Sequence, residues 1–130
     1  MHRVIARNKK RRERDNAMTE AYAIVDRRDG GYCRVTGRFT QPGAVDPRVR
    51  REHHHLSGRN VAPQDRANPD RIITVAAEVH QLLHARLLEY QGDSANERIV
   101  FHWSEKVKPE DRPFHIKSKR WSQNQDEDVA

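Results

Sequence analysis

The sequence predicts a small α+β domain. Three observations predict it: apolar residues recur at helical spacing over residues 18–29, β-branched residues cluster at 72–75, and a second helical pattern covers 76–90. With 130 residues, the chain has room for one such domain. Hydrophobic residues make up 35% of the chain and charged residues 34%, so we expect a small core with solvated segments around it.

The first 17 residues are strongly basic and contain few apolar side chains. Their positive residues are Arg3, Arg7, Lys9, Lys10, Arg11, Arg12 and Arg14. The whole chain has a net charge of +6 and an isoelectric point near 9.9, which favours a polyanionic partner such as nucleic acid. We therefore expect residues 1–17 to be a basic arm that contacts phosphates through residues 9–12. A solvated chain end is the alternative interpretation.

The predicted domain covers residues 18–116. A helix over 18–29 ends at Gly30-Gly31, and a brief strand is predicted at 32–35, before loop residues that extend to 47. A strand over 48–56, a loop, a return strand at 72–75 and a helix at 76–90 form the central part, with the motif core at 48–88. Residues 98–103 predict an extra strand, and the polar and acidic residues 117–130 predict a disordered tail.

The sequence gives no sign of a membrane or an oxidising compartment. No segment approaches the about 18 consecutive apolar residues of a membrane-spanning helix, and the basic N-terminus lacks the apolar core of a secretory signal. A single cysteine, Cys33, excludes an internal disulfide and any zinc site with two cysteines. We expect a soluble, cytoplasmic protein without a membrane partner.

Histidines provide the strongest chemical signal in the sequence. Three are consecutive, at 53–55, and because neighbours on a strand face opposite sides, at least one must face solvent or a site. His80 and His84 are four residues apart on a predicted helix, so their imidazoles lie on the same side and can share an ion. A histidine run alone, or a histidine pair at this spacing alone, more often belongs to ordinary protein surface than to a metal site. Together they predict that imidazoles from a strand and a helix converge.

These segments resemble the HNH endonucleases, including small phage and prophage members and the colicin DNases. The segments that carry the resemblance are Glu52-His53-His54-His55-Leu56, then residues 68–75, and then Val79-His80-Gln81-Leu82-Leu83-His84. Residues 28–37 are similar to the lead-in of members with a Cys-x-x-Cys zinc knuckle. The resemblance covers about residues 24–88 and implies a ββα-metal (HNH, or His-Me finger) core that hydrolyses phosphodiester bonds in DNA, expected to be double-stranded.

Transferred position by position, the resemblance also implies roles for individual residues. His54, His80 and His84 would hold one divalent metal ion. His55 would be the general base that deprotonates the attacking water, and Glu52 would support the site.

The central asparagine of the family is replaced here. It falls nine residues before the helix histidine, where this chain has Arg71. In one interpretation Arg71 acts at the site as a phosphate clamp or loop tie, and the nuclease is active. In the other, the substitution marks loss of activity. Asn68 and Asn60 are loop amides that could replace the missing asparagine.

The zinc knuckle of the family is also missing. Thr36, Ala76 and Val79 stand where those members have cysteine, which leaves Cys33 alone. We therefore expect no structural zinc, apolar packing of Val35, Ala76 and Val79 in its place, and Cys33 as a small buried hydrophobic residue.

The implied cofactor is one divalent ion from the set Mg, Mn, Ni or Zn. Imidazole ligands suit Zn and Ni better than Mg, which prefers oxygen ligands. Arg59 and Arg71 are candidates to hold backbone phosphates beside the ion, although ordinary solvated surface is the alternative for Arg59. Three hypotheses stay open: a metal-dependent DNA endonuclease, an inactive HNH-like nucleic-acid-binding module, and a protein whose histidines bind metal only to stabilise its small core.

Overall fold

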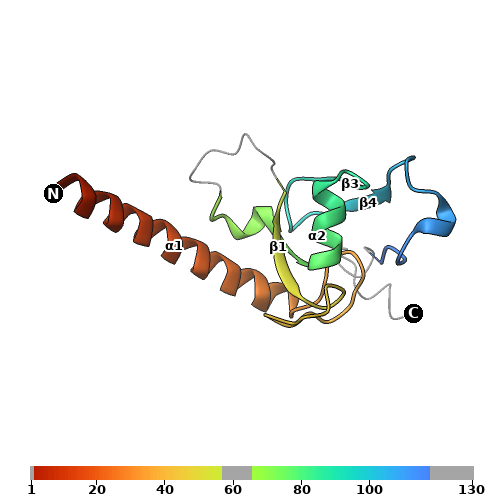
Figure 1. The fold of residues 1–130 in the computed structure, drawn as a ribbon, viewed down its shortest axis with the longest axis horizontal. Helices are drawn as coiled ribbons and strands as arrows, with labels where there is room; N and C mark the ends of the chain where they lie inside the picture. The colour runs from red at the N-terminus through yellow and green to blue at the C-terminus, as the bar shows by residue number, and fades with distance from the viewer. Residues whose placement is uncertain (1, 57–65, 118–130) are drawn as a thin grey trace.

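The computed structural model describes residues 2–56 and 66–117, and it confirms an α+β fold (Figure 1). Within these ranges the chain forms two α-helices and two small antiparallel sheets. The main elements are α1 (His2–Asp29), β1 (Arg51–His55), the 3-10 turn η3 (Pro69–Arg71), β2 (Ile72–Ala76), α2 (Ala77–His84), β3 (Leu88–Gln91), β4 (Val100–Trp103) and η4 (Pro109–Asp111). Of the described residues, no helix combines the length and the apolar character needed to cross a membrane.

Helix α1 joins the basic arm and the predicted helix at 18–29 into one continuous element. Its C-terminal half packs on the domain, where Ala21 and Val25 are buried against Ile72 of β2. Residues 8–17 are exposed all around the helix, and Figure 1 shows this half extending away from the rest of the protein. The helix ends at Asp29, and the next residue, Gly30, has a φ of 65°, a left-handed conformation that glycine adopts without strain.

The prediction of a strand at residues 32–35 is wrong. This segment forms tight turns with one isolated bridge between Tyr32 and Phe39. The amide of Cys33 donates to the carbonyl of Arg38 at 2.8 Å, and the amide of Gly37 donates back to Cys33 at 2.9 Å. The chain therefore reverses too soon for a ladder to form.

Strands β1 and β2 pair in an antiparallel sheet that places the histidines. His54 lies opposite Ile73, and His55 lies opposite Ile72. The return strand predicted at 72–75 is confirmed, and all five residues of β2 are buried. Helix α2 begins directly after β2, so it covers the side of the sheet that His54 faces.

The helix predicted over 76–90 is too long. Helix α2 ends at His84, Arg86 takes a left-handed φ of 58°, and β3 follows. β3 pairs with β4, which confirms a strand within the predicted residues 98–103 and adds a second sheet that the sequence did not predict. Leu88 still reaches the core, as its helical spacing suggested, but it does so from a strand.

One apolar cluster fills the space between the two sheets and α2. Cys33, Val35, Ala76 and Val79 all belong to it, and each is at most 1% exposed. The predicted apolar packing at the positions of the zinc knuckle is therefore confirmed, as is the burial of the free Cys33.

Candidate metal centre

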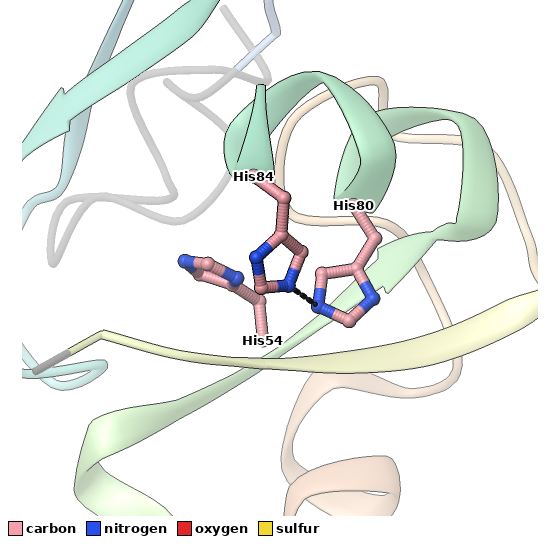
Figure 2. A group of neighbouring side chains, drawn as sticks. All are labelled: His54, His80 and His84. Atoms are coloured by element: carbon pink, nitrogen blue, oxygen red, sulfur yellow. Dashed lines mark hydrogen bonds between the residues drawn. The ribbon is translucent and has the colours of Figure 1, made fainter. Parts of the chain in front are cut away.

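Strand alternation divides the residues of β1 between two helices. Glu52 and His54 face α2, and His53 and His55 face α1, as their side-chain contacts show. The three predicted metal ligands, His54, His80 and His84, meet on the α2 side (Figure 2). One ring nitrogen from each lies within 4.8 Å of the others, close enough for the three to hold one metal ion.

The carboxylate of Glu52 orients the ring of His80. Its Oε1 lies 2.7 Å from Nδ1 of His80, which places the imidazole proton on Nδ1. The other ring nitrogen, Nε2, then carries a lone pair and lies 2.9 Å from Nε2 of His84. A carboxylate behind a histidine is the arrangement that fixes the tautomer and raises the basicity of metal ligands.

His54 has a second partner that fixes its tautomer as well. Its Nε2 lies 3.3 Å from the hydroxyl oxygen of Tyr90, whose own proton is donated to the carbonyl of Leu56 at 2.8 Å. The Tyr90 oxygen therefore accepts a hydrogen bond from Nε2–H, and the lone pair of His54 is on Nδ1. This Nδ1 is buried and has no hydrogen-bond partner in the described part of the chain.

Burial also keeps His54 neutral. Desolvation, followed by the neighbouring histidines 80, 84 and 55, lowers its pKa from 6.5 to about 3. A buried lone pair without a partner is costly for a folded protein, and a metal ion would satisfy it. The chemistry of this site therefore fits an ion with a preference for imidazole.

The spacing of the nitrogens is compatible with a bound ion after small movements. Metal–nitrogen bonds of about 2.0–2.1 Å in a tetrahedral site put two ligand nitrogens about 3.3 Å apart. The Nε2–Nε2 distance between His80 and His84, 2.9 Å, is slightly shorter than this tetrahedral distance. The ligand nitrogens of the cluster lie up to 4.8 Å apart, which is longer than the tetrahedral distance. His84 is exposed and can adjust. Three protein ligands would leave a coordination position open.

The α1 side of β1 is organised differently. Nε2 of His53 lies 2.7 Å from Asp26 Oδ1, and its ring stacks on Tyr22 with the centroids 4.2 Å apart. The Tyr22 hydroxyl lies 3.2 Å from Nε2 of His55. Burial, then His53, His80 and Arg66, lower the pKa of His55, so this imidazole is neutral at neutral pH.

The loop before β2 holds the remaining predicted residues. Arg71 is the last residue of η3, and its carbonyl accepts from the amide of Leu56 at 2.8 Å, just past His55. The side chain of Asn68 accepts from the amide of Asp70 at 3.0 Å and so caps η3. Arg59 and Asn60 lie outside the described residues.

The basic residues predicted to bind nucleic acid lie far from the histidine cluster along α1. Lys9, Lys10, Arg11 and Arg12 are all exposed. Lys9 precedes Tyr22 by 13 residues, or about 20 Å along the helix axis. They share no contact with the proposed ligands.

Three residues around the histidines were missed in the sequence. Tyr22 and Asp26 are one helical turn apart on α1, a spacing that could have signalled a shared face, although nothing local pairs them with β1. Tyr90 was assigned to a helix that in fact ends at His84, so its contact with His54 could not be predicted.

Comparisons of the chain with protein-family models, with curated proteins and with solved structures return no match.

Proposed function

We propose that the protein is a metal-dependent nuclease that hydrolyses phosphodiester bonds in DNA, with β1, β2 and α2 as a ββα-metal core. The observation that carries the proposal is the convergence of His54, His80 and His84. Hydrogen bonds to Tyr90 and Glu52 leave lone pairs on Nδ1 of His54 and Nε2 of His80. This donor set suits zinc or nickel better than magnesium.

A bound ion would polarise the scissile phosphate and neutralise charge on the leaving oxygen. His55 accepts the proton of the attacking water. Its Nε2 lies 3.2 Å from the Tyr22 hydroxyl, and the proposal requires the tautomer in which Nε2–H donates to that hydroxyl and the lone pair is on Nδ1. Because the lowered pKa keeps His55 neutral, it is ready to take that proton at neutral pH, an effect typically worth about 10² to 10⁴ in rate.

Glu52 and Arg71 have supporting roles in this proposal. Glu52 keeps the His80 ring in place through its 2.7 Å hydrogen bond. Arg71 is the last residue of η3, and its carbonyl accepts from the amide of Leu56, the residue after His55. The Arg71 guanidinium carries the positive charge that a phosphate contact requires. We infer that Asn68, whose side chain caps η3 by accepting from the amide of Asp70, replaces the loop tie that the family assigns to asparagine.

The direct test is cleavage of supercoiled plasmid DNA with a panel of Mg, Mn, Co, Ni and Zn. We expect cleavage that depends on the metal and that falls by about 10² or more in the His55→Ala variant. His53→Ala is the matched control, because His53 is a neighbouring imidazole on the same side of β1 and should retain most of the activity. Absence of cleavage with every metal would refute the proposal.

One observation favours a second candidate, an inactive nucleic-acid-binding module. His55 and the three clustered histidines lie on opposite sides of β1, so a single phosphate must reach around the end of the strand to meet both. This candidate predicts salt-sensitive DNA binding, no cleavage with any metal, and no effect of His55→Ala on binding.

A further inference from the structure

The basic residues of α1 are not distributed evenly around the helix. At about 100° per residue, Lys10, Arg11 and Arg14 fall on one side, and we call these three residues the basic stripe. Lys9 and Arg12 fall on the opposite side, about 150° from the centre of the stripe. The helix therefore has two basic sides that can be compared.

Acidic residues do not interrupt the basic stripe. Between residues 8 and 17 the acids are Glu13 and Asp15, and each lies about 100° from the centre of the stripe, one on either flank. The positive charge is consequently concentrated along one line. In the sequence, Arg7 and Arg3 continue the same spacing.

The basic stripe is in line with the buried face of the same helix. Arg14 is followed at helical intervals of four and three residues by Met18 and Ala21, and then by Val25. Ala21 and Val25 are 1% and 0% exposed and pack against Ile72 of β2. The stripe therefore faces the side on which the β1–β2 sheet lies, but at a point where α1 has extended beyond the sheet (Figure 1).

The same side of α1 leads to the proposed general base. Tyr22, whose hydroxyl lies 3.2 Å from His55, is eight residues from Arg14 and twelve from Lys10. At about 1.5 Å per residue, the stripe begins about 12 Å along the axis from Tyr22 and extends to about 18 Å. A polyanion that reaches His55 can thus touch the stripe as well.

The composition of this half of α1 indicates what kind of partner it binds. Residues 8–17 are all exposed, and Ala17 is their single apolar residue. A membrane-surface helix needs a large apolar face, and a protein interface needs apolar or aromatic anchors. Binding here must rest on charge alone, which matches the regularly spaced phosphates of a nucleic-acid backbone.

We propose that the basic stripe binds the backbone of double-stranded DNA that lies along the sheet side of α1 and continues to His55. The continuation to His55 rests on the proposed nuclease function, but binding of the duplex does not require hydrolysis. Lys9 and Arg12, on the opposite side of the same helix, do not take part.

The test compares two double variants of the full chain that remove the same charge. They are Lys10→Gln/Arg14→Gln on the stripe and Lys9→Gln/Arg12→Gln on the opposite side. Binding of a short fluorescent duplex is measured by anisotropy in EDTA, so that no cleavage takes place, over a series of salt concentrations. Far-ultraviolet circular dichroism checks that both variants keep their helices.

We expect the stripe variant to bind roughly 10- to 60-fold more weakly near 0.1 M salt, with a salt dependence reduced by about 1.8 in log–log slope. The opposite-side variant should change by no more than about twofold. Equal losses in the two variants, no loss in either, or no duplex binding by the wild-type chain would overturn the proposal.

The two proposals can fail separately. If the wild-type chain binds duplex through the basic stripe but cleaves no plasmid with any metal, the proposed nuclease function is refuted and the proposed DNA binding by the stripe is supported. If the stripe variant binds duplex and cleaves plasmid as the wild type does, the proposed DNA binding by the stripe is refuted and the proposed nuclease function is supported.

Discussion

The two sides of β1 use the same residue type for different purposes. On the α1 side, Nε2 of His53 contacts Asp26 at 2.7 Å, and Nε2 of His55 contacts the Tyr22 hydroxyl at 3.2 Å. On the α2 side, Nδ1 of His54 is buried without a partner within the described ranges. A buried ring nitrogen without a partner is costly, so Nδ1 of His54 offers a place for a ligand.

The difference lies in the neighbouring helix. Helix α1 presents an acid and a phenol, whereas α2 presents two more imidazoles, His80 and His84, which hydrogen-bond each other at 2.9 Å and leave Nδ1 of His54 without a partner in the described part of the chain. The α2 side should therefore respond to metal ions, and the α1 side should not.

The first prediction that sharpens this comparison concerns Glu52, which faces α2. Glu52→Gln weakens the hydrogen-bond acceptor for Nδ1 of His80, so metal affinity should fall by about 10- to 100-fold. Calorimetric titration with Zn²⁺ or Ni²⁺ measures it. The matched control is Glu89→Gln, because Glu89 also pairs with an imidazole, His102, at 3.5 Å. Equal losses in both variants would contradict the assignment.

The second effect is a pH dependence of stability in the metal-free protein. The pKa of His54 is about 3 in the fold, below its usual 6.5, because burial disfavours the charged ring. The unfolded chain binds the additional proton between these values, so stability falls as pH decreases from about 6.5 toward 3. His80, His84 and Tyr90 are the groups that face His54.

Urea unfolding in EDTA at several pH values measures this dependence. His54 alone should reduce the free energy of unfolding by about 2 kcal/mol between pH 7 and pH 5. The His54→Gln variant, which has no imidazole to protonate, should lack this part of the slope. An unchanged slope in that variant would show that His54 is not buried as a neutral ring.

The smallest effect separates the two tyrosines that contact the histidines. Tyr22→Phe removes the hydroxyl that contacts His55 and keeps the ring stacked on His53, so plasmid cleavage should slow by roughly 2- to 10-fold with metal affinity unchanged. Tyr90→Phe should instead change metal affinity, because Tyr90 orients His54. The opposite pattern, with metal affinity affected only by Tyr22→Phe, would reverse the roles of the two sides.

Much of the candidate site could be predicted from the sequence because its signals are local. Strand alternation separates His54 from its neighbours, and helical spacing puts His80 and His84 on one side. The β-branched residues at the start of β2 indicated a strand without reference to the rest of the fold.

The remainder depends on contacts between distant segments or on backbone choices without a local signal. Leu87 and Leu88 fit a helix as well as a strand, and the reversal before them occurs at Arg86, with a φ of 58° and no glycine to mark it. The contacts of Tyr22 with β1 join residues 33 positions apart, which no local pattern encodes. Residues 8–17 lack apolar periodicity, so no pattern in the sequence indicates that the basic arm is helical.

The central claim is that the α2 side of β1 is a metal centre and the α1 side is not. Calorimetric titration of the metal-free wild-type chain with Zn²⁺ and Ni²⁺, next to His54→Asn and His53→Asn variants, tests it most directly. We predict one ion per chain for the wild type and for His53→Asn, and affinity reduced by at least about 10²-fold in His54→Asn. No binding by the wild type, or equal losses in the two variants, would contradict the account.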